Sequence, residues 1–396
     1  MLSNEVKTVS ESQRSAKRAP RLGLLDALRI LAALIVVLYH YTAWGHQHWG
    51  TPVSEAWPVL SHFTIYGSIG VQLFFLISGF VILMSVQGKG LISFIASRLG
   101  RLYPAYWLAV VAAAVLTFGI WPEIRDGRTT EDIAPNLTMA QAGMGVRDLD
   151  GVYWTLWVEL RFYIILAVLV ALRKVTDKVI LGLSFLWPVL GVVLHLIEAP
   201  KAQEWVMGQY APLFAIGMIV YLMYRGERTG LRWGLLAFNT VLACYFTGIK
   251  GAKDASYLSG MEIPAWHFSL LTLACVGLLL LCTLTPLRSV HARWMVTAGM
   301  LTYPLYLFHQ LWGWWLIEIF SGALNKYVLL ALTILTMLGL SYVVARFVEK
   351  PAGLWLRNEF TRLASTLEST LRTVHRNRRA QAITEPKYLP LWRQIR

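Results

Sequence analysis

Long apolar stretches alternate with short polar segments along most of this chain. A helix needs about 20 residues to cross a bilayer, and a window of that length finds ten such stretches. They lie near 24–43, 67–86, 102–121, 151–172, 179–197, 209–224, 233–248, 265–286, 297–320 and 327–348. The pattern predicts an all-α polytopic membrane protein with about ten transmembrane helices.

The overall composition supports this class. Hydrophobic residues make up 56% of the 396 positions and charged residues only 15%, whereas a soluble domain of this size needs more charge on its surface. The three cysteines, Cys244, Cys275 and Cys282, fall in apolar stretches without disulfide or metal-ligand spacing. We therefore expect them to be small core residues.

The net charge of +14 is distributed as the positive-inside rule describes. Lysine and arginine gather at the two ends and in alternate loops, and the segment 44–66 has none. This indicates that both termini are cytoplasmic, and it argues against nucleic-acid binding. We divide the chain into a basic N-terminal segment (1–21), a membrane domain (22–351) and a basic cytoplasmic tail (352–396), which we expect to contact anionic lipid.

Two ionisable residues lie within the first apolar stretch. Arg29 precedes His40 by eleven positions, which on a helix is about three turns and roughly 16 Å along the same side. Such side chains are costly in lipid and mark function by default. In the alternative reading, Arg29 extends to the inner interface and His40 hydrogen-bonds a neighbouring helix. A neutral imidazole at this position is suited to act as a general base toward a hydroxyl.

Glu159 and His309 lie inside the fourth and ninth apolar stretches. A carboxylate at such a depth must be paired, protonated or in contact with water. Glu159 is therefore either a structural ion-pair partner or a group that orients a catalytic histidine. His309 is either a hydrogen-bonded core histidine or part of the same site. No stretch contains paired ligands at helical spacing, and we predict no metal site.

Two arginines stand just before the third apolar stretch. Arg98 and Arg101 are three positions apart and share one helix face, where they are suited to bind a phosphate. Ordinary positive-inside charge is the alternative. The stretch 70–80, GVQLFFLISGF, places small residues where helices approach closely, and within it Ser78 is a candidate for lining a cavity.

These motifs, in this order, resemble the acyltransferase-3 family of integral membrane acyltransferases. The resemblance runs from about residue 22 to 352. It rests on Asp26-Ala-Leu-Arg29 with His40-Tyr41, GVQLFFLISGF at 70–80, Arg98 and Arg101 before Tyr103-Pro104, WTLWVELRFY at 154–163, YPLYLFH at 303–309, and Glu349-Lys350-Pro351.

The resemblance implies a multi-pass protein of the inner membrane. It would transfer an acyl group from cytoplasmic acyl-CoA, most commonly acetyl-CoA, to a hydroxyl of a glycan or glycolipid. Some relatives carry a fused periplasmic esterase-like domain. Because the tail here is short and on the inner side, we expect a stand-alone transferase, for which any such periplasmic partner is a separate protein.

The combined hypothesis assigns a role to each residue. Arg98 and Arg101 hold the CoA phosphates, and Arg29 guides the thioester. His40 is the base, and Glu159 supports it. The candidates for stabilising the oxyanion are Ser78, Tyr103 and His309. Direct transfer and a covalent acyl intermediate both remain open.

The rival class is a proton-coupled membrane transporter of acyl groups or lipid-linked sugars, which would use the same intramembrane charges. A scaffold protein is a third class, disfavoured because it needs no buried charges.

Overall fold

The computed structural model describes residues 22–44 and 46–384, and the basic segment 1–21 and the last residues, 385–396, lie outside the described part. Within it the chain is helical and contains no strand. The principal helices are α2 (Gly23–Tyr39), α5 (Ile69–Val86), α6 (Leu91–Val115), α8 (Trp154–Ala171), α9 (Asp177–Leu196), α11 (Ala211–Arg225), α12 (Gly230–Ser259), α13 (Ala265–Leu284), α14 (Arg293–Phe320), α15 (Lys326–Val344) and α16 (Lys350–Thr384).

Eight helical stretches in the described part are long and apolar enough to cross a membrane. The all-α polytopic class is therefore confirmed. The two remaining stretches expected from the sequence, near 209–224 and 297–320, are helices α11 and α14, which are not among the eight. α11 has only 15 residues and is buried along nearly its whole length. It packs against α5, α9, α12 and α13. Because other helices surround it, few of its residues would contact lipid.

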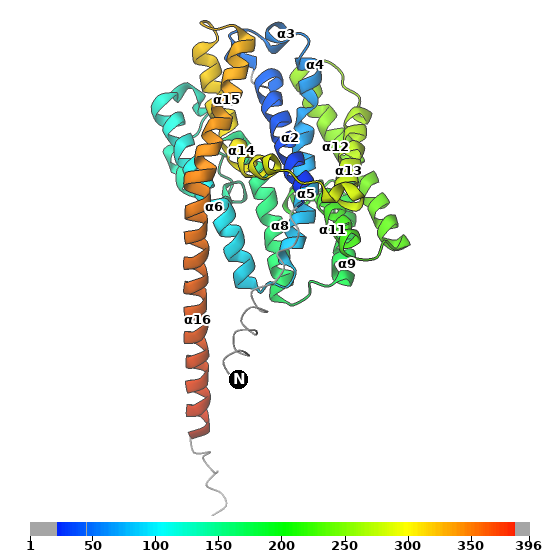
Figure 1. Ribbon diagram of the computed structural model, residues 1–396, viewed down its shortest axis with the longest axis vertical. Coiled ribbons are helices and arrows are strands. Elements are labelled where there is room, and N and C mark those ends of the chain that lie inside the picture. Colours follow the sequence, from blue (N-terminus) through cyan, green and yellow to red (C-terminus); the bar gives the residue numbers. More distant parts are fainter. Residues whose placement is uncertain (1–21, 45, 385–396) are drawn as a thin grey trace, which may run out of the picture.

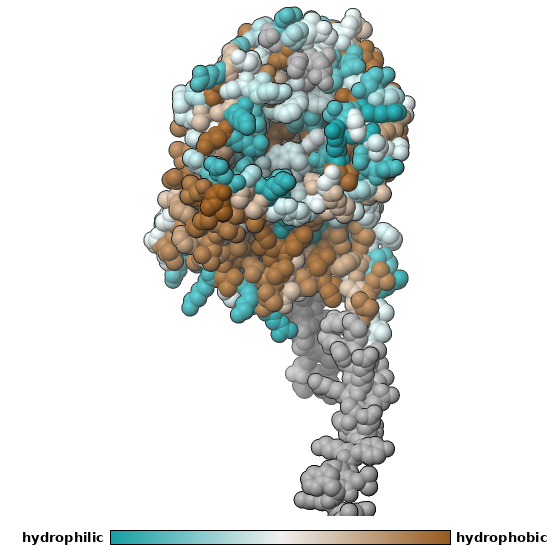
Figure 2. Space-filling view, turned by 180° about the vertical axis from the view of Figure 1, so that it is seen from behind, coloured by the Kyte–Doolittle hydropathy of each residue, from teal (hydrophilic) through white to brown (hydrophobic). Residues whose placement is uncertain are grey.

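The outer surface of the bundle is apolar where lipid would contact it. On the face shown in Figure 2, apolar residues form a broad band across the lower part of the body, and polar residues cover the part above it. Exposed leucines such as Leu186, Leu196 and Leu231 would carry a large cost in water. The surface is therefore typical of a protein solvated by acyl chains.

The stretch 70–80 serves mainly as a packing face, one of its two predicted roles. A Cβ atom on Gly79 would lie 2.3 Å from the carbonyl oxygen of Phe214, and one on Gly217 would lie 2.2 Å from that of Leu76. Only glycine allows the backbones of α5 and α11 to come this close. The crossing fixes α5 in the centre of the molecule, where its other side lines a cavity.

Helices extend beyond two of the expected apolar stretches. The third helix begins at Leu91 rather than near 102, so Arg98 and Arg101 lie inside α6 and not before it. The segment after 351 continues as the helix α16, which extends away from the body in Figure 1. Both extensions carry charged residues that an apolar window excludes, although charge on a helix surface in water costs little.

The segment 122–150, between α6 and α8, folds into short helical turns, among them α7 (Ile133–Asn136). The Asn136 side chain is fully buried, donates to the carbonyl oxygens of Asp132 and Arg147, and accepts from the backbone N–H of Leu149. Such a bonded network orders the loop against the bundle.

Candidate functional site

The site is built around a pair of histidines from α2 and α14. At His40 the α-helix changes to a π-helical turn, η1 (His40–Trp44), a feature that is frequent at functional sites. Two indole N–H groups hold this turn: Trp314 Nε1 donates to the His40 carbonyl oxygen at 2.9 Å, and Trp49 Nε1 to that of Tyr41 at 2.7 Å. The imidazole of His40 therefore projects from a fixed backbone.

His309 lies against His40. The distance from His309 Nε2 to His40 Nδ1 is 3.0 Å. His309 is fully buried, and its Nδ1 lies 3.1 Å and 2.9 Å from the carbonyl oxygens of Leu305 and Tyr306. Tyr41 donates its hydroxyl hydrogen to the His309 carbonyl oxygen at 2.7 Å, which ties the two helices together at this level.

These contacts assign the tautomers. A carbonyl oxygen only accepts, so the Nδ1 of a neutral His309 carries the hydrogen and its Nε2 is left as an acceptor. His40 Nδ1 faces that acceptor and, at 3.0 Å, the Val36 carbonyl oxygen, so it also carries a hydrogen. The lone pair of His40 is then on Nε2, the nitrogen a general base would use.

A cavity of about 360 Å³ lies beside this pair. It is lined by α2, α5, α6, α8 and α14. Five of the residues singled out from the sequence line it: Arg29, Ser78, Arg98, Arg101 and Glu159. A cavity of this size with a few converging charges is typical of a small-molecule site.

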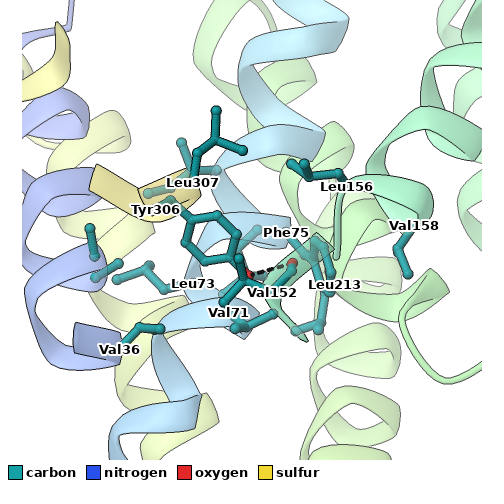
Figure 3. Close-up of a cluster of buried hydrophobic side chains, with 14 of the residues drawn as sticks. Val36, Val71, Leu73, Phe75, Val152, Leu156, Val158, Leu213, Tyr306 and Leu307 are labelled. Carbon is teal, nitrogen blue, oxygen red and sulfur yellow. Dashed lines mark hydrogen bonds between the residues drawn. The ribbon is translucent and has the colours of Figure 1, made fainter. Parts of the chain in front are cut away.

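Two aromatic rings separate the cavity from the histidine pair. Tyr306 lines the cavity, and the centre of its ring is 5.7 Å from that of His309, one turn further along α14. The ring of Phe74, 5.7 Å away, packs edge-on against Tyr306. Figure 3 shows Tyr306 among apolar side chains of α2, α5 and α8, with the bond from its hydroxyl to the Val152 carbonyl oxygen. The arginines and the histidines thus occupy opposite sides of this aromatic layer.

Glu159 is held inside the cavity and not at His40. It accepts hydrogen bonds from the Ser78 hydroxyl at 2.9 Å and from the Tyr163 hydroxyl at 2.7 Å, both on Oε1. The contact to His40 that the sequence assigned to Glu159 is made by His309. Arg161, two positions away, donates to the carbonyl oxygens of Glu204 and Trp205.

The three arginines of the cavity differ in their partners. Arg101 forms an ion pair with Glu349, which is buried. Arg29 lies 4.0 Å from Asp26, one turn away. Arg98 donates to Ser97 Oγ and lies over the Tyr163 ring, and it pairs with no carboxylate among the described residues. Arg98 therefore has the most charge left for an anionic ligand.

The oxyanion candidates are already engaged in other bonds. The Ser78 hydroxyl donates to Glu159, and the Tyr103 hydroxyl donates to the Thr138 carbonyl oxygen at 2.9 Å and does not line the cavity. His309 directs its two nitrogens to backbone and to His40. Among the residues described, no group of three His, Cys, Asp or Glu side chains is placed to hold a metal.

Asp150 anchors α14 from outside the spanning helices. Its carboxylate accepts from the backbone N–H groups of Val152 at 3.2 Å and of Leu311 at 3.5 Å. Burial raises the pKa of Asp150 to about 7. Since Leu311 follows His309 by two residues, this contact helps fix the histidine pair.

The sequence reading missed Tyr306, Tyr163 and Asp150. Tyr306 precedes His309 by three positions and Tyr163 follows Glu159 by four, so the helical spacing could have placed each on the face of its partner. Asp150 carried no such signal, because its partner Leu311 belongs to a distant helix.

Several known proteins are similar to this chain. A family model described as an acyltransferase domain matches residues 23–346. The acyltransferase MdmB of Streptomyces mycarofaciens is 30% identical over 37% of this chain and 38% of its own length. Nodulation protein 10 of Rhizobium leguminosarum bv. viciae is 26% identical over 74% of this chain and 87% of its own. The O-acetyl transferase of Shigella phage Sf6 is 24% identical, over 68% and 92%. No solved structure matches the chain.

Proposed function

The chain belongs to the acyltransferase-3 family. From this premise we propose that it transfers an acyl group from acyl-CoA to a hydroxyl of a cell-envelope or exported carbohydrate, with acetyl as the favoured acyl group. The observation that carries the proposal is the His40–His309 pair, one helical turn beyond a cavity lined by three arginines. The family model and two of the relatives are described as acyltransferases, so the transporter alternative is not pursued.

The donor end of the proposal rests on the cavity. Thioesters of CoA are anionic at the nucleotide end and neutral at the acyl end. Arg98 is free of carboxylate partners among the described residues, and Arg29 lies on α2, the helix that leads to His40. In the proposal Arg98 binds the phosphates and Arg29 guides the thioester. Arg101, already paired with Glu349, contributes mainly to structure.

The proposed reaction with the acceptor hydroxyl is based on the tautomer of His40, which leaves its lone pair on Nε2. In the proposed step His40 Nε2 takes the proton of an acceptor hydroxyl, and the oxygen attacks the thioester carbonyl carbon. The carbon–sulfur bond breaks, and the CoA thiolate takes the proton from His40. His309 Nε2 accepts from His40 Nδ1 throughout, which stabilises the imidazolium that forms.

Direct transfer is the simpler route for this geometry. The cavity lining contains no cysteine, and the Ser78 hydroxyl donates to Glu159. A hydroxyl whose hydrogen is held by a carboxylate could be activated as a nucleophile, but Ser78 is on the far side of the aromatic layer from His40. We propose that Glu159 orients Ser78 and Tyr163 and offsets the positive charge of the arginines when the cavity is empty.

We infer the sidedness of the reaction from the charge distribution of the loops. With both termini on the cytoplasmic face of the inner membrane, Arg98 lies toward the cytoplasm and His40 lies in the outer half of its helix. The acyl group would then pass the Phe74–Tyr306 layer, while the nucleotide stays on the cytoplasmic side. The glycan acceptor would approach His40 from the outer side.

Mass spectrometry of envelope glycans tests this function. Cells with the intact chain should show a glycan heavier by one acyl group, and cells with His40→Gln should lack it. His195→Gln is the matched control, because His195 is exposed to the bundle surface and contacts Tyr245 outside the cavity. Identical glycan masses in the intact and His40→Gln cells would overturn the proposal.

A further inference from the structure

A second hollow lies at the ends of α5 and α8 and the start of α6, separate from the cavity. It is an open groove of about 980 Å³. Its walls are the turn between α5 and α6 (87–90), the first turn of α6, the end of α8 through Arg173, and α16 with Thr361 and Ser365. In Figure 1 the ends of α5 and α8 and the start of α6 lie together at the lower edge of the body, and α16 passes beside α6.

The groove continues the cavity along three helices. On α5 the cavity reaches Ile82 and the groove begins at Val86, and on α6 the cavity ends at Ser97 and the groove includes Ser93. Each of these two steps spans four residues, which is about 6 Å along the helix axis. On α8 the step runs from Tyr163 to Val170 and is about 10 Å. All three steps lead toward the cytoplasmic side of the predicted topology.

The groove is positively charged. Lys89 and Arg173 line it, and among the described residues neither pairs with a carboxylate. Burial lowers the pKa of Lys89, and the nearby charges of Arg98 and Arg357 lower it further. Arg98 also lines the cavity, so one band of positive charge extends from the cavity into the groove.

The wall formed by α16 is fixed by a close helix crossing. A Cβ atom on Gly100 would lie 2.4 Å from the carbonyl oxygen of Gly353, so α6 and α16 touch backbone to backbone. Arg357, Thr361 and Ser365 follow Gly353 at intervals of four and run along one side of α16. The two hydroxyls donate to carbonyl oxygens of their own helix. Lys89 and Arg173 are therefore the charged donors that line this groove.

We propose that the groove binds the adenosine end of acyl-CoA through its 3′-phosphate, with Lys89 and Arg173 as the contacting residues. This inference rests on the proposed function, since it extends the donor site from the cavity to the nucleotide. A single ligand that carries phosphates along its length and a doubly anionic phosphate at one end matches a band of positive charge that runs through two adjoining hollows. Lysine and arginine are the usual partners of such a phosphate.

The phosphate of an anionic lipid has the same chemistry, so the experiment must separate the two sources. The full-length chain in phosphatidylcholine nanodiscs is titrated calorimetrically with CoA and with 3′-dephospho-CoA. We expect the intact protein to bind CoA about tenfold more tightly. Lys89→Ala/Arg173→Ala should bind both compounds equally, with the affinity that the intact protein has for 3′-dephospho-CoA. Lys174→Ala, a neighbouring basic residue that does not line the groove, should keep the tenfold preference.

The outcomes are distinguishable. Equal binding of the two compounds by the intact protein, or an unchanged preference in the double variant, would overturn the groove assignment and leave the acyl-CoA donor in place. No binding of CoA at all would overturn the donor, and the groove with it. If the double variant loses only binding of phosphatidylglycerol, measured after this lipid is added to the nanodiscs, the groove is a lipid site and the inference is wrong.

Discussion

His309 Nε2 lies 3.0 Å from His40 Nδ1, although the two residues are 269 positions apart in the chain. Because His309 Nδ1 is held by two backbone carbonyl oxygens, the contact leaves the lone pair of His40 on Nε2. His309 therefore occupies the place that a carboxylate takes beside many catalytic histidines, without bringing a negative charge into the membrane.

The first prediction concerns the hydrogen bond between His40 and His309. His309→Ala should lower kcat on the order of 10- to 100-fold, because a misplaced base can cost about that much, while KM for acyl-CoA stays unchanged. His309→Gln should restore part of kcat, since its side-chain oxygen can accept from His40 Nδ1. Steady-state kinetics of both variants measure this, and an equal loss in Ala and Gln would show that His309 acts only through packing.

The second prediction separates two neighbouring arginines. Arg101→Ala should destabilise the protein by about 1–3 kcal/mol, because it leaves the buried carboxylate of Glu349 without its cation. Arg98→Ala should leave thermal stability unchanged and raise KM for acyl-CoA about tenfold, the effect of about 1.4 kcal/mol.

Thermal unfolding in detergent and kinetics check these arginine variants. The double variant Arg101→Ala/Glu349→Ala should be more stable than Arg101→Ala alone, because no buried charge is left unpaired. If the double variant is the less stable of the two, the ion pair does not explain the role of Arg101.

The third prediction tests the helix crossing in the centre of the bundle. Gly79→Leu should destabilise the protein by about 1–3 kcal/mol or more, since overpacking at this contact forces α5 and α11 apart. Gly182→Ala on α9 has open space around the added Cβ and should be neutral or slightly stabilising. Melting temperatures measure both, and equal effects of the two changes would contradict the crossing.

The fourth prediction concerns pH. The pKa of Asp150, raised by burial from 3.8 to about 7, means that the folded protein holds a proton that the unfolded chain releases. The free energy of unfolding should therefore fall as pH rises from about 4 to about 7, by a few kcal/mol at most. Asp150→Asn keeps a cap for Val152 and should reduce this fall. Melting curves at about pH 5 and about pH 8 compare the intact protein with Asp150→Asn. The same pH dependence in both would contradict the raised pKa of Asp150.

The sequence predicted the membrane class and singled out most of the candidate site residues for one physical reason. Apolar length marks a span, and an ionisable residue inside such a span is costly enough to stand out. Arg29, His40 and Glu159 were found in this way. Arg98 was found by its spacing from Arg101, although the sequence placed both arginines outside the helix that contains them.

The partners of these residues could not be predicted. His40 and His309, Ser78 and Glu159, and Arg101 and Glu349 each come from different helices, and helix order in a chain does not determine which helices touch. The expected support of His40 by Glu159 came from residue type alone. In the folded bundle these two side chains lie on opposite sides of the Phe74–Tyr306 layer, and His309 lies next to His40 instead.

We propose that the donor binds on the arginine side of the Phe74–Tyr306 layer and that His40 acts on the other side. Inverted membrane vesicles, whose cytoplasmic face is outward, are given acetyl-CoA with an isotope-labelled acetyl group, and the label in the glycan fraction is measured. The intact protein should transfer the label. His40→Gln should bind acetyl-CoA with unchanged affinity and transfer at least about 100-fold more slowly. Transfer at the intact rate by His40→Gln, or transfer only in right-side-out vesicles, would contradict the account.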